Sequence, residues 1–178
     1  VIAPAHHRRI QAGILSWGQD MDHQHNPFQC NLGYQVSLSG KGQWSKSADY
    51  VGKEALEKMK LQLKNGEKPY KLQLVGMELD GKPIEDYAND FWLISKNNKS
   101  KPVGFVTSPW YHPEKKTNIA MGYVPYEGNL NSNGFPIGNF GKEYKVHLPK
   151  KYSTKPVTAT VVPIPFTASH NKNTRESN

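Results

Sequence analysis

The chain has 178 residues, of which 36% are hydrophobic, with a formal net charge of +8 and a single cysteine. This length suits one globular domain, or one domain with part of a second, and no apolar run approaches the about 20 residues that span a bilayer. Cys30 alone cannot form an internal disulfide and favours a reducing, cytoplasmic location, while the scattered lysines follow no pattern typical of a nucleic-acid-binding protein.

The first predicted element is a helix over residues 6–17. Ile10, Ile14 and Trp17 recur at the spacing of one helical face, and Gly18 is a plausible stop. We therefore expect these three side chains to pack together on one side of the helix.

A polar loop and a strand are expected next. Pro27 prevents the helix from continuing, and apolar residues alternate toward the end of residues 28–38, which predicts a strand with Cys30 half-buried in it. After a polar loop over residues 40–49, an apolar stripe at helical spacing predicts a second helix over residues 51–64.

The rest of the chain reads as short strands separated by turn residues. This pattern is typical of a β-barrel or a β-sandwich. The strands are expected at residues 70–79, 91–95, 103–107, 118–124, 144–148 and 157–161.

The proposed domain boundary lies near Asn26. Residues 1–25 would be a terminal helix and loop of a preceding domain, because this helix has no neighbour of its own in the sequence. Residues 26–168 would form a self-sufficient β domain with one packed helix, and the polar residues 169–178 a disordered tail. The predicted fold class is α+β, mostly β.

Few residues stand in a pattern typical of catalysis or metal binding. The stretch Asp22-His23-Gln24-His25 contains metal-ligand types, but the spacing is too short for a helical pair and a third ligand is lacking, so we expect a solvated loop and no metal site. Neither Ser16 nor Ser108 has a histidine and an acid nearby, and no glycine-rich phosphate loop is present. No catalytic residue is assigned in this chain.

Arg9 is the strongest candidate for a binding role. A guanidinium on a largely apolar helix can bind an anion through two N–H groups. The alternatives are that Arg9 reaches to water or pairs with an internal carboxylate, and the latter would indicate a structural role.

Three blocks, in this order, resemble the aminomethyltransferase family, whose best-known member is the glycine-cleavage T-protein and which includes folate-dependent demethylases. The first is similar to the family's Arg-Leu-Glu-Ala-Gly helix and the loop after it, the second to its Ile-Gly-Lys-Glu-Ala-Leu helix start, and the third to its near-terminal strand pair. The blocks are residues 9–22 with Asn26-Pro27-Phe28, residues 51–56, and residues 106–109 with 118–124.

The resemblance implies a C-terminal antiparallel β-barrel, preceded by the last helix of a middle domain. It also implies one-carbon transfer to tetrahydrofolate from a small methylated or aminomethyl donor, with a lipoyl carrier protein as a possible partner. The acid/base residue and most of the folate site would lie in upstream domains, before Val1, so we expect this chain alone to be inactive. An alternative is a non-catalytic barrel that binds a carrier protein or a partner subunit.

Two cofactor-binding residues follow from the resemblance. Arg9 matches the family's folate-contacting arginine, and Trp17 matches an aromatic position that packs the helix or stacks on the ligand. Gln11 departs from the pattern, because the family usually has Glu there. The segment 166–170 lacks the tyrosine expected shortly after it, which puts a C-terminal ligand contact in doubt.

Overall fold

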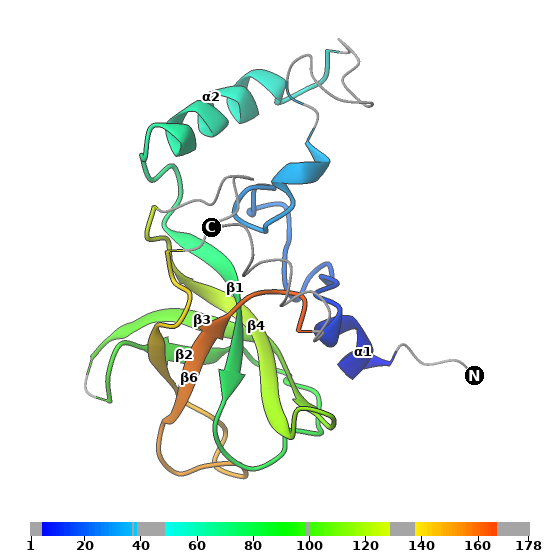
Figure 1. Cartoon of the computed structure of the whole chain (residues 1–178), viewed down its shortest axis with the longest axis vertical. Helices are drawn as coiled ribbons and strands as arrows, with labels where there is room; N and C mark the ends of the chain where they lie inside the picture. Colours follow the sequence, from blue (N-terminus) through cyan, green and yellow to red (C-terminus); the bar gives the residue numbers. More distant parts are fainter. Residues whose placement is uncertain (1–4, 37, 39–48, 99, 129–137, 167–178) are drawn as a thin grey trace.

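Six strands close into an antiparallel barrel in the computed structural model, which describes residues 5–36, 38, 49–98, 100–128 and 138–166 (Figure 1). Around the barrel the order is β1, β4, β3, β2, β5, β6. The strands are β1 (Leu72–Leu79), β2 (Trp92–Ser95), β3 (Pro102–His112), β4 (Thr117–Pro125), β5 (Glu143–Val146) and β6 (Val157–Val162). The prediction of a mostly β fold with a C-terminal antiparallel barrel is confirmed.

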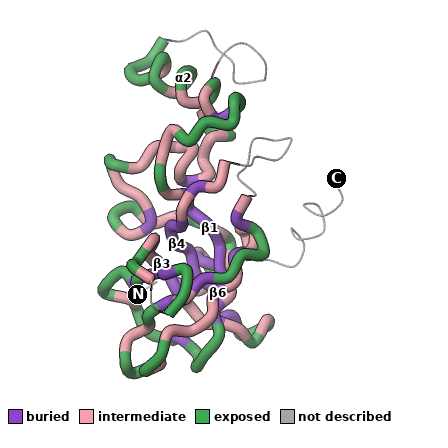
Figure 2. Tube along the Cα trace, turned by 90° about the vertical axis from the view of Figure 1, so that its left-hand side faces the viewer, coloured by how far each residue is buried: buried purple, intermediate pink, exposed green. Residues whose placement is uncertain are grey.

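The barrel has one hydrophobic core inside and a second on its outer wall. Successive side chains of a strand point to opposite faces, so β4 sends Ala120 and Val124 into the barrel and Met121 and Tyr123 outward. Both sets are buried, which explains why these strands are apolar on both faces. The outer cluster consists of Ile10, Leu74, Ile119, Met121, Tyr123 and Phe166. Figure 2 shows buried backbone along β1 and β4, the strands on which most of these residues lie.

The first helix, α1 (His6–Gln11), is shorter than the predicted helix over residues 6–17. Gly13 takes φ +70°, and the amides of Gly13 and Ile14 donate to the carbonyls of Ile10 and Arg9. These two bonds form a Schellman motif, which ends a helix at a left-handed residue. Ile14 and Trp17 therefore lie beyond the end of the helix, although their spacing is helical.

The described segment 28–36 is not a strand, which corrects the strand predicted over residues 28–38. Turns and the short 3₁₀ helix η1 (Gly33–Gln35) occupy it, and Tyr34 is largely exposed. The side chain of Asn26 accepts the Gln29 amide and nucleates the first turn, and Asn31 adopts φ 61°. Cys30 is buried in this turn rather than half-buried in a strand.

The second helix, α2 (Lys53–Lys64), agrees with the predicted helix over residues 51–64 apart from its start. It begins after Gly52, which adopts φ 88°, and Gly66 at φ 76° follows its end. In Figure 1 it lies beyond one end of the barrel, and Leu63 is its buried residue. The residues proposed for the preceding loop, apart from position 49, and for the tail after 168 lie outside the described residues.

The helix that packs against the barrel wall is α1, which contacts β3 and β4. Ile10 is fully buried in the outer cluster, and the Phe166 amide donates to the Gln11 carbonyl at 2.9 Å. The N-terminal segment and the segment after β6 are thus joined on the same wall. The domain boundary near Asn26 stays a prediction.

Candidate functional site

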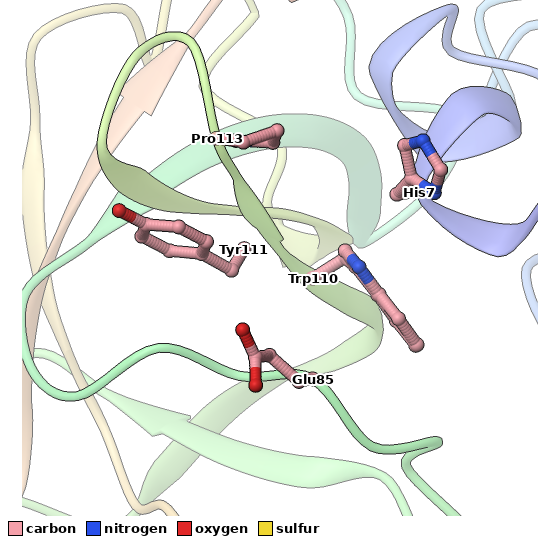
Figure 3. A pocket seen from close by; sticks show the side chains of 5 residues that line it. All are labelled: His7, Glu85, Trp110, Tyr111 and Pro113. Atoms are coloured by element: carbon pink, nitrogen blue, oxygen red, sulfur yellow. The ribbon is translucent and has the colours of Figure 1, made fainter.

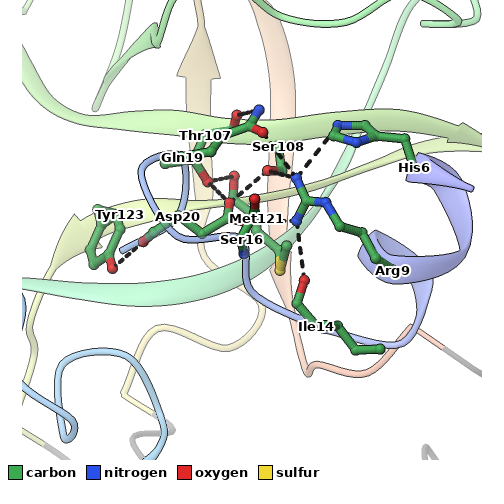
Figure 4. A network of polar contacts seen from close by, with 10 residues as sticks. All are labelled: His6, Arg9, Ile14, Ser16, Gln19, Asp20, Thr107, Ser108, Met121 and Tyr123. Carbon is green, nitrogen blue, oxygen red and sulfur yellow. Dashed lines mark hydrogen bonds and ion pairs between the residues drawn. The ribbon is translucent and has the colours of Figure 1, made fainter. Parts of the chain in front are cut away.

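Asp20 lies at the centre of a buried polar cluster between the N-terminal segment and the barrel (Figure 4). Its side chain is completely buried and forms an ion pair with Arg9, with 2.7 Å between Oδ2 and Nη1. Oδ2 also accepts the Ser16 amide at 2.9 Å, while Oδ1 accepts the hydroxyls of Thr107 and Ser108 at 2.5 and 2.6 Å. Each carboxylate oxygen therefore has two donors.

A β-bulge at Thr107 presents both hydroxyls to Asp20. In the β3–β4 pairing Val106 lies opposite Gly122 and Ser108 opposite Met121, so Thr107 is an extra residue without a partner. A regular strand would point residues 107 and 108 to opposite faces. The bulge removes this alternation and turns both side chains toward the carboxylate.

Arg9 is held by internal acceptors as well as by Asp20. Its Nη1 donates to Asp20 and to the Ile14 carbonyl, and its Nη2 donates to Ser108 Oγ at 2.7 Å and to Gln19 Oε1 at 3.2 Å. Nη2 also lies 3.5 Å from His6 Nε2, so internal groups surround both Nη atoms, and the side chain is 15% exposed. This is the alternative in which the arginine pairs with an internal carboxylate.

Tyr123 extends the cluster into the outer core. Its hydroxyl donates to the Asp20 backbone carbonyl at 2.7 Å and lies 3.4 Å from Cys30 Sγ. Burial raises the pKa of the Tyr123 phenol and that of the Cys30 thiol, so both groups stay protonated near neutral pH. A protonated, buried thiol is a poor nucleophile, which favours a packing role for Cys30.

Trp17 projects from the loop that follows α1 and is 68% exposed. It does not pack the helix, contrary to our expectation. Its loop is nonetheless ordered, because Asp20 binds the Ser16 amide, the Gly18 amide donates to the Met21 carbonyl at 2.8 Å, and Trp17 forms a β-bridge with Met21. The structure thus places Arg9 and Trp17 on one segment, with the first enclosed and the second open to solvent.

Asp22 and His25 form a local pair with 2.8 Å between Oδ1 and Nδ1. Hydrogen bonds from the Gln24 amide and from His25 lower the pKa of Asp22. Among the described residues, no group of three or more His, Cys, Asp or Glu side chains could hold a metal ion.

The buried state of His6 predicts a pH dependence of stability. Burial, and then the nearby Arg9 charge, lower the pKa of His6, and burial likewise lowers that of His112. Below the unfolded value of 6.5 the unfolded state therefore binds more protons than the folded state, so stability falls as the pH drops.

We expect urea midpoints to be lower at pH 5.5 than at pH 7.5, and His6→Gln to reduce that difference. Equal midpoints at both pH values in the unchanged chain would contradict the prediction.

The fold and the cluster together define a closed β-barrel domain with an N-terminal segment on its outer wall. The Arg9–Asp20 ion pair lies within this segment, and its hydrogen bonds with Thr107 and Ser108 of β3 fasten the segment to the barrel. Residues 73–167 match the model of the glycine cleavage T-protein C-terminal barrel domain. The chain belongs to this family.

Curated relatives extend the similarity to the N-terminal segment. The chain is 33% identical over 159 residues to an aminomethyltransferase of Thermosynechococcus vestitus, and 32% identical over 158 residues to one of Prochlorococcus marinus, with 89% of this chain covered in each case. These alignments cover 35% and 34% of the relatives, so the chain spans about a third of their length.

A solved structure shares the fold. The glycine cleavage system aminomethyltransferase T from Bartonella henselae superposes with a TM-score of 0.61 at 23% identity, over 89% of this chain and 37% of the other. Within the described part of the chain, no helix is both long and apolar enough to cross a membrane.

Proposed function

We propose that the chain forms the C-terminal part of a tetrahydrofolate-dependent aminomethyl- or methyltransferase. The observation that carries this proposal is the family match, supported by relatives named aminomethyltransferase over most of the chain. Tetrahydrofolate, when bound, would accept the one-carbon group on a ring nitrogen. A small methylated or aminomethyl compound would be the donor, and a lipoyl carrier protein would be a partner.

Trp17 fits a contact with folate better than Arg9 does. Its ring is exposed on an ordered loop, and an indole can stack on the flat pterin ring. The Nη groups of Arg9 are occupied by internal acceptors, which favours a positioning role in which Arg9 holds the loop through Asp20. Direct contact between Arg9 and folate stays a prediction.

Folate binding can be tested by titrating the chain with tetrahydrofolate under anaerobic conditions and measuring the heat of binding by calorimetry. We expect weak, saturable binding that Trp17→Leu abolishes or weakens by roughly tenfold, the order of one lost aromatic contact. Trp110→Leu is the matched control, since it removes another indole outside the Trp17 loop. Equal affinities for the chain and Trp17→Leu would contradict the proposed contact.

We also expect the chain alone to lack one-carbon transfer activity, because no catalytic acid or base is assigned in it. Product formation from an aminomethyl-lipoyl carrier or a methylated donor, in the presence of tetrahydrofolate, measures this directly. The expectation would be contradicted if the chain alone formed product and if substituting a residue of the Asp20 cluster abolished that product formation.

A non-catalytic docking module is the second candidate. The net charge of +8 and the internal use of Arg9 favour it, since an acidic partner would be attracted to the barrel without any folate contact. Saturable binding of a lipoyl carrier protein together with absent folate binding would support this function over the first.

A further inference from the structure

A small hollow opens between α1 and the end of β3 (Figure 3). His7, Glu85, Trp110, Tyr111 and Pro113 line it. Its volume is about 160 Å³. Pockets for drug-sized ligands begin at about 300 Å³, so this hollow fits one small molecule or a single side chain.

The backbone that carries Glu85 is fixed to the barrel. The preceding residue, Ile84, is fully buried, its carbonyl accepts the Tyr111 amide at 2.8 Å, and its amide donates to Asn118 Oδ1 at 2.9 Å. The backbone at Glu85 is therefore held in place beside β3. In Figure 3 its carboxylate points into the space between Tyr111 and Trp110.

The indole of Trp110 is held in place by two other rings. Its ring centroid lies 5.4 Å from that of His6 and 5.9 Å from that of Tyr87, and both pairs meet edge to face. Because these contacts restrict the side chain, the hollow has a preformed aromatic wall. A preformed wall lowers the entropy cost of binding.

The charge in the hollow is negative although the chain is basic. Within the described residues Glu85 has neither an ion pair nor a side-chain hydrogen bond. The adjacent Asp86 pairs with Lys151 at 2.7 Å, and Lys115, close to Pro113 in sequence, pairs with Glu78 at 2.8 Å. These two lysines are thus paired with other carboxylates, and no ion pair in the described part of the chain neutralises the Glu85 charge.

We propose that this hollow binds a small methylated ammonium ion. A carboxylate beside an aromatic wall attracts an organic cation in two ways, through charge and through the negative face of the ring. Glu85 supplies the counter-charge, and Trp110, with Tyr111 beside it, supplies the aromatic surface. The ligand is either a free amine or the methylated lysine of a peptide, and the site is independent of the folate function proposed above.

The test follows the indole N–H signal of Trp110 by NMR, assigned with Trp110→Phe, at low ionic strength. The probes are choline, its neutral isostere 3,3-dimethylbutan-1-ol, and a short peptide with one trimethyllysine. We expect saturable shifts with choline or the peptide and none with the neutral isostere. The cationic probe that binds more tightly identifies whether the ligand is a free amine or the methylated lysine of a peptide.

Glu85→Gln should weaken this binding by roughly three- to fivefold, the range of an exposed ion pair. Glu114→Gln is the matched control, because it removes one negative charge from the β3–β4 turn, next to Pro113, without altering the lining of the hollow. The proposal is overturned if neither cation saturates, if the neutral isostere binds equally well, or if the two variants behave alike.

Discussion

Replacing Asp20 by Asn is expected to lower the free energy of unfolding by about 3 kcal/mol, because it leaves the Arg9 charge without its partner in a largely enclosed site. The carboxylate side chain is completely buried and Arg9 is 15% exposed, so water replaces little of the lost interaction. The amide group also turns a donor toward hydroxyls that now donate to Asp20. Urea unfolding followed by circular dichroism measures the loss.

Asp22→Asn is the matched control for this prediction. Asp22 lies two residues away, and its side chain is 40% exposed, so the same change there is expected to lower the free energy of unfolding far less than Asp20→Asn does. A double-mutant cycle with Arg9→Met should give a coupling energy of at least about 1 kcal/mol. Equal stability of Asp20→Asn and the unchanged chain would refute the structural role of the pair. If Asp20→Asn does not fold, Ser108→Ala gives a milder loss of about 1–2 kcal/mol.

The ion pair with Asp20 gives Arg9 a structural role in this chain. Its charge is neutralised by Asp20, and its Nη groups hold the loop, the helix end and the β3 bulge together. Such an arrangement fixes the direction in which the loop presents Trp17. If this segment binds a ligand, Arg9 would therefore affect the binding by fixing the conformation of the loop, even where its guanidinium does not contact the ligand.

Much of the barrel was predictable because its signals are local. Alternating apolar residues and turn residues predicted all six strands, five of them to within two residues at each end, and a stripe at helical spacing predicted α2. The exception is β3, which extends five residues beyond the predicted end at residue 107. The wrong predictions concern two segments in which three apolar residues matched the spacing of a helix or of a strand by chance. Ile14 and Trp17 matched a helix that ends at the Gly13 turn. Tyr34, Val36 and Leu38 matched a strand, whereas Tyr34 lies in the 3₁₀ helix η1 and Val36 directly follows it.

The candidate site was only partly predictable. Arg9 was singled out, but its partners Asp20 and Ser108 were not, and Ser108 lies 99 residues away in the sequence. Their meeting depends on the β-bulge at Thr107. The Ser-Pro pair at 108–109 is the one available signal, since proline in a strand is typical of edges and bulges.

Gly13→Ala is expected to lower the free energy of unfolding by about 3 kcal/mol, from two separable causes. Gly13 adopts φ +70°, which strains a residue with a side chain, and a Cβ there would lie 2.1 Å from Ile164 Cγ2, in the segment after β6 that contacts α1.

Gly18→Ala is the matched control, because it introduces the backbone strain without the steric clash. Gly18 adopts φ +81°, and no atom lies within 4 Å of a Cβ placed there. We therefore expect about 1–2 kcal/mol for Gly18→Ala, from backbone strain alone. The difference between the two measures how tightly the segment after β6 closes on the helix end. Equal losses would show that Ile164 yields freely and that this junction does not fix the N-terminal segment to the barrel.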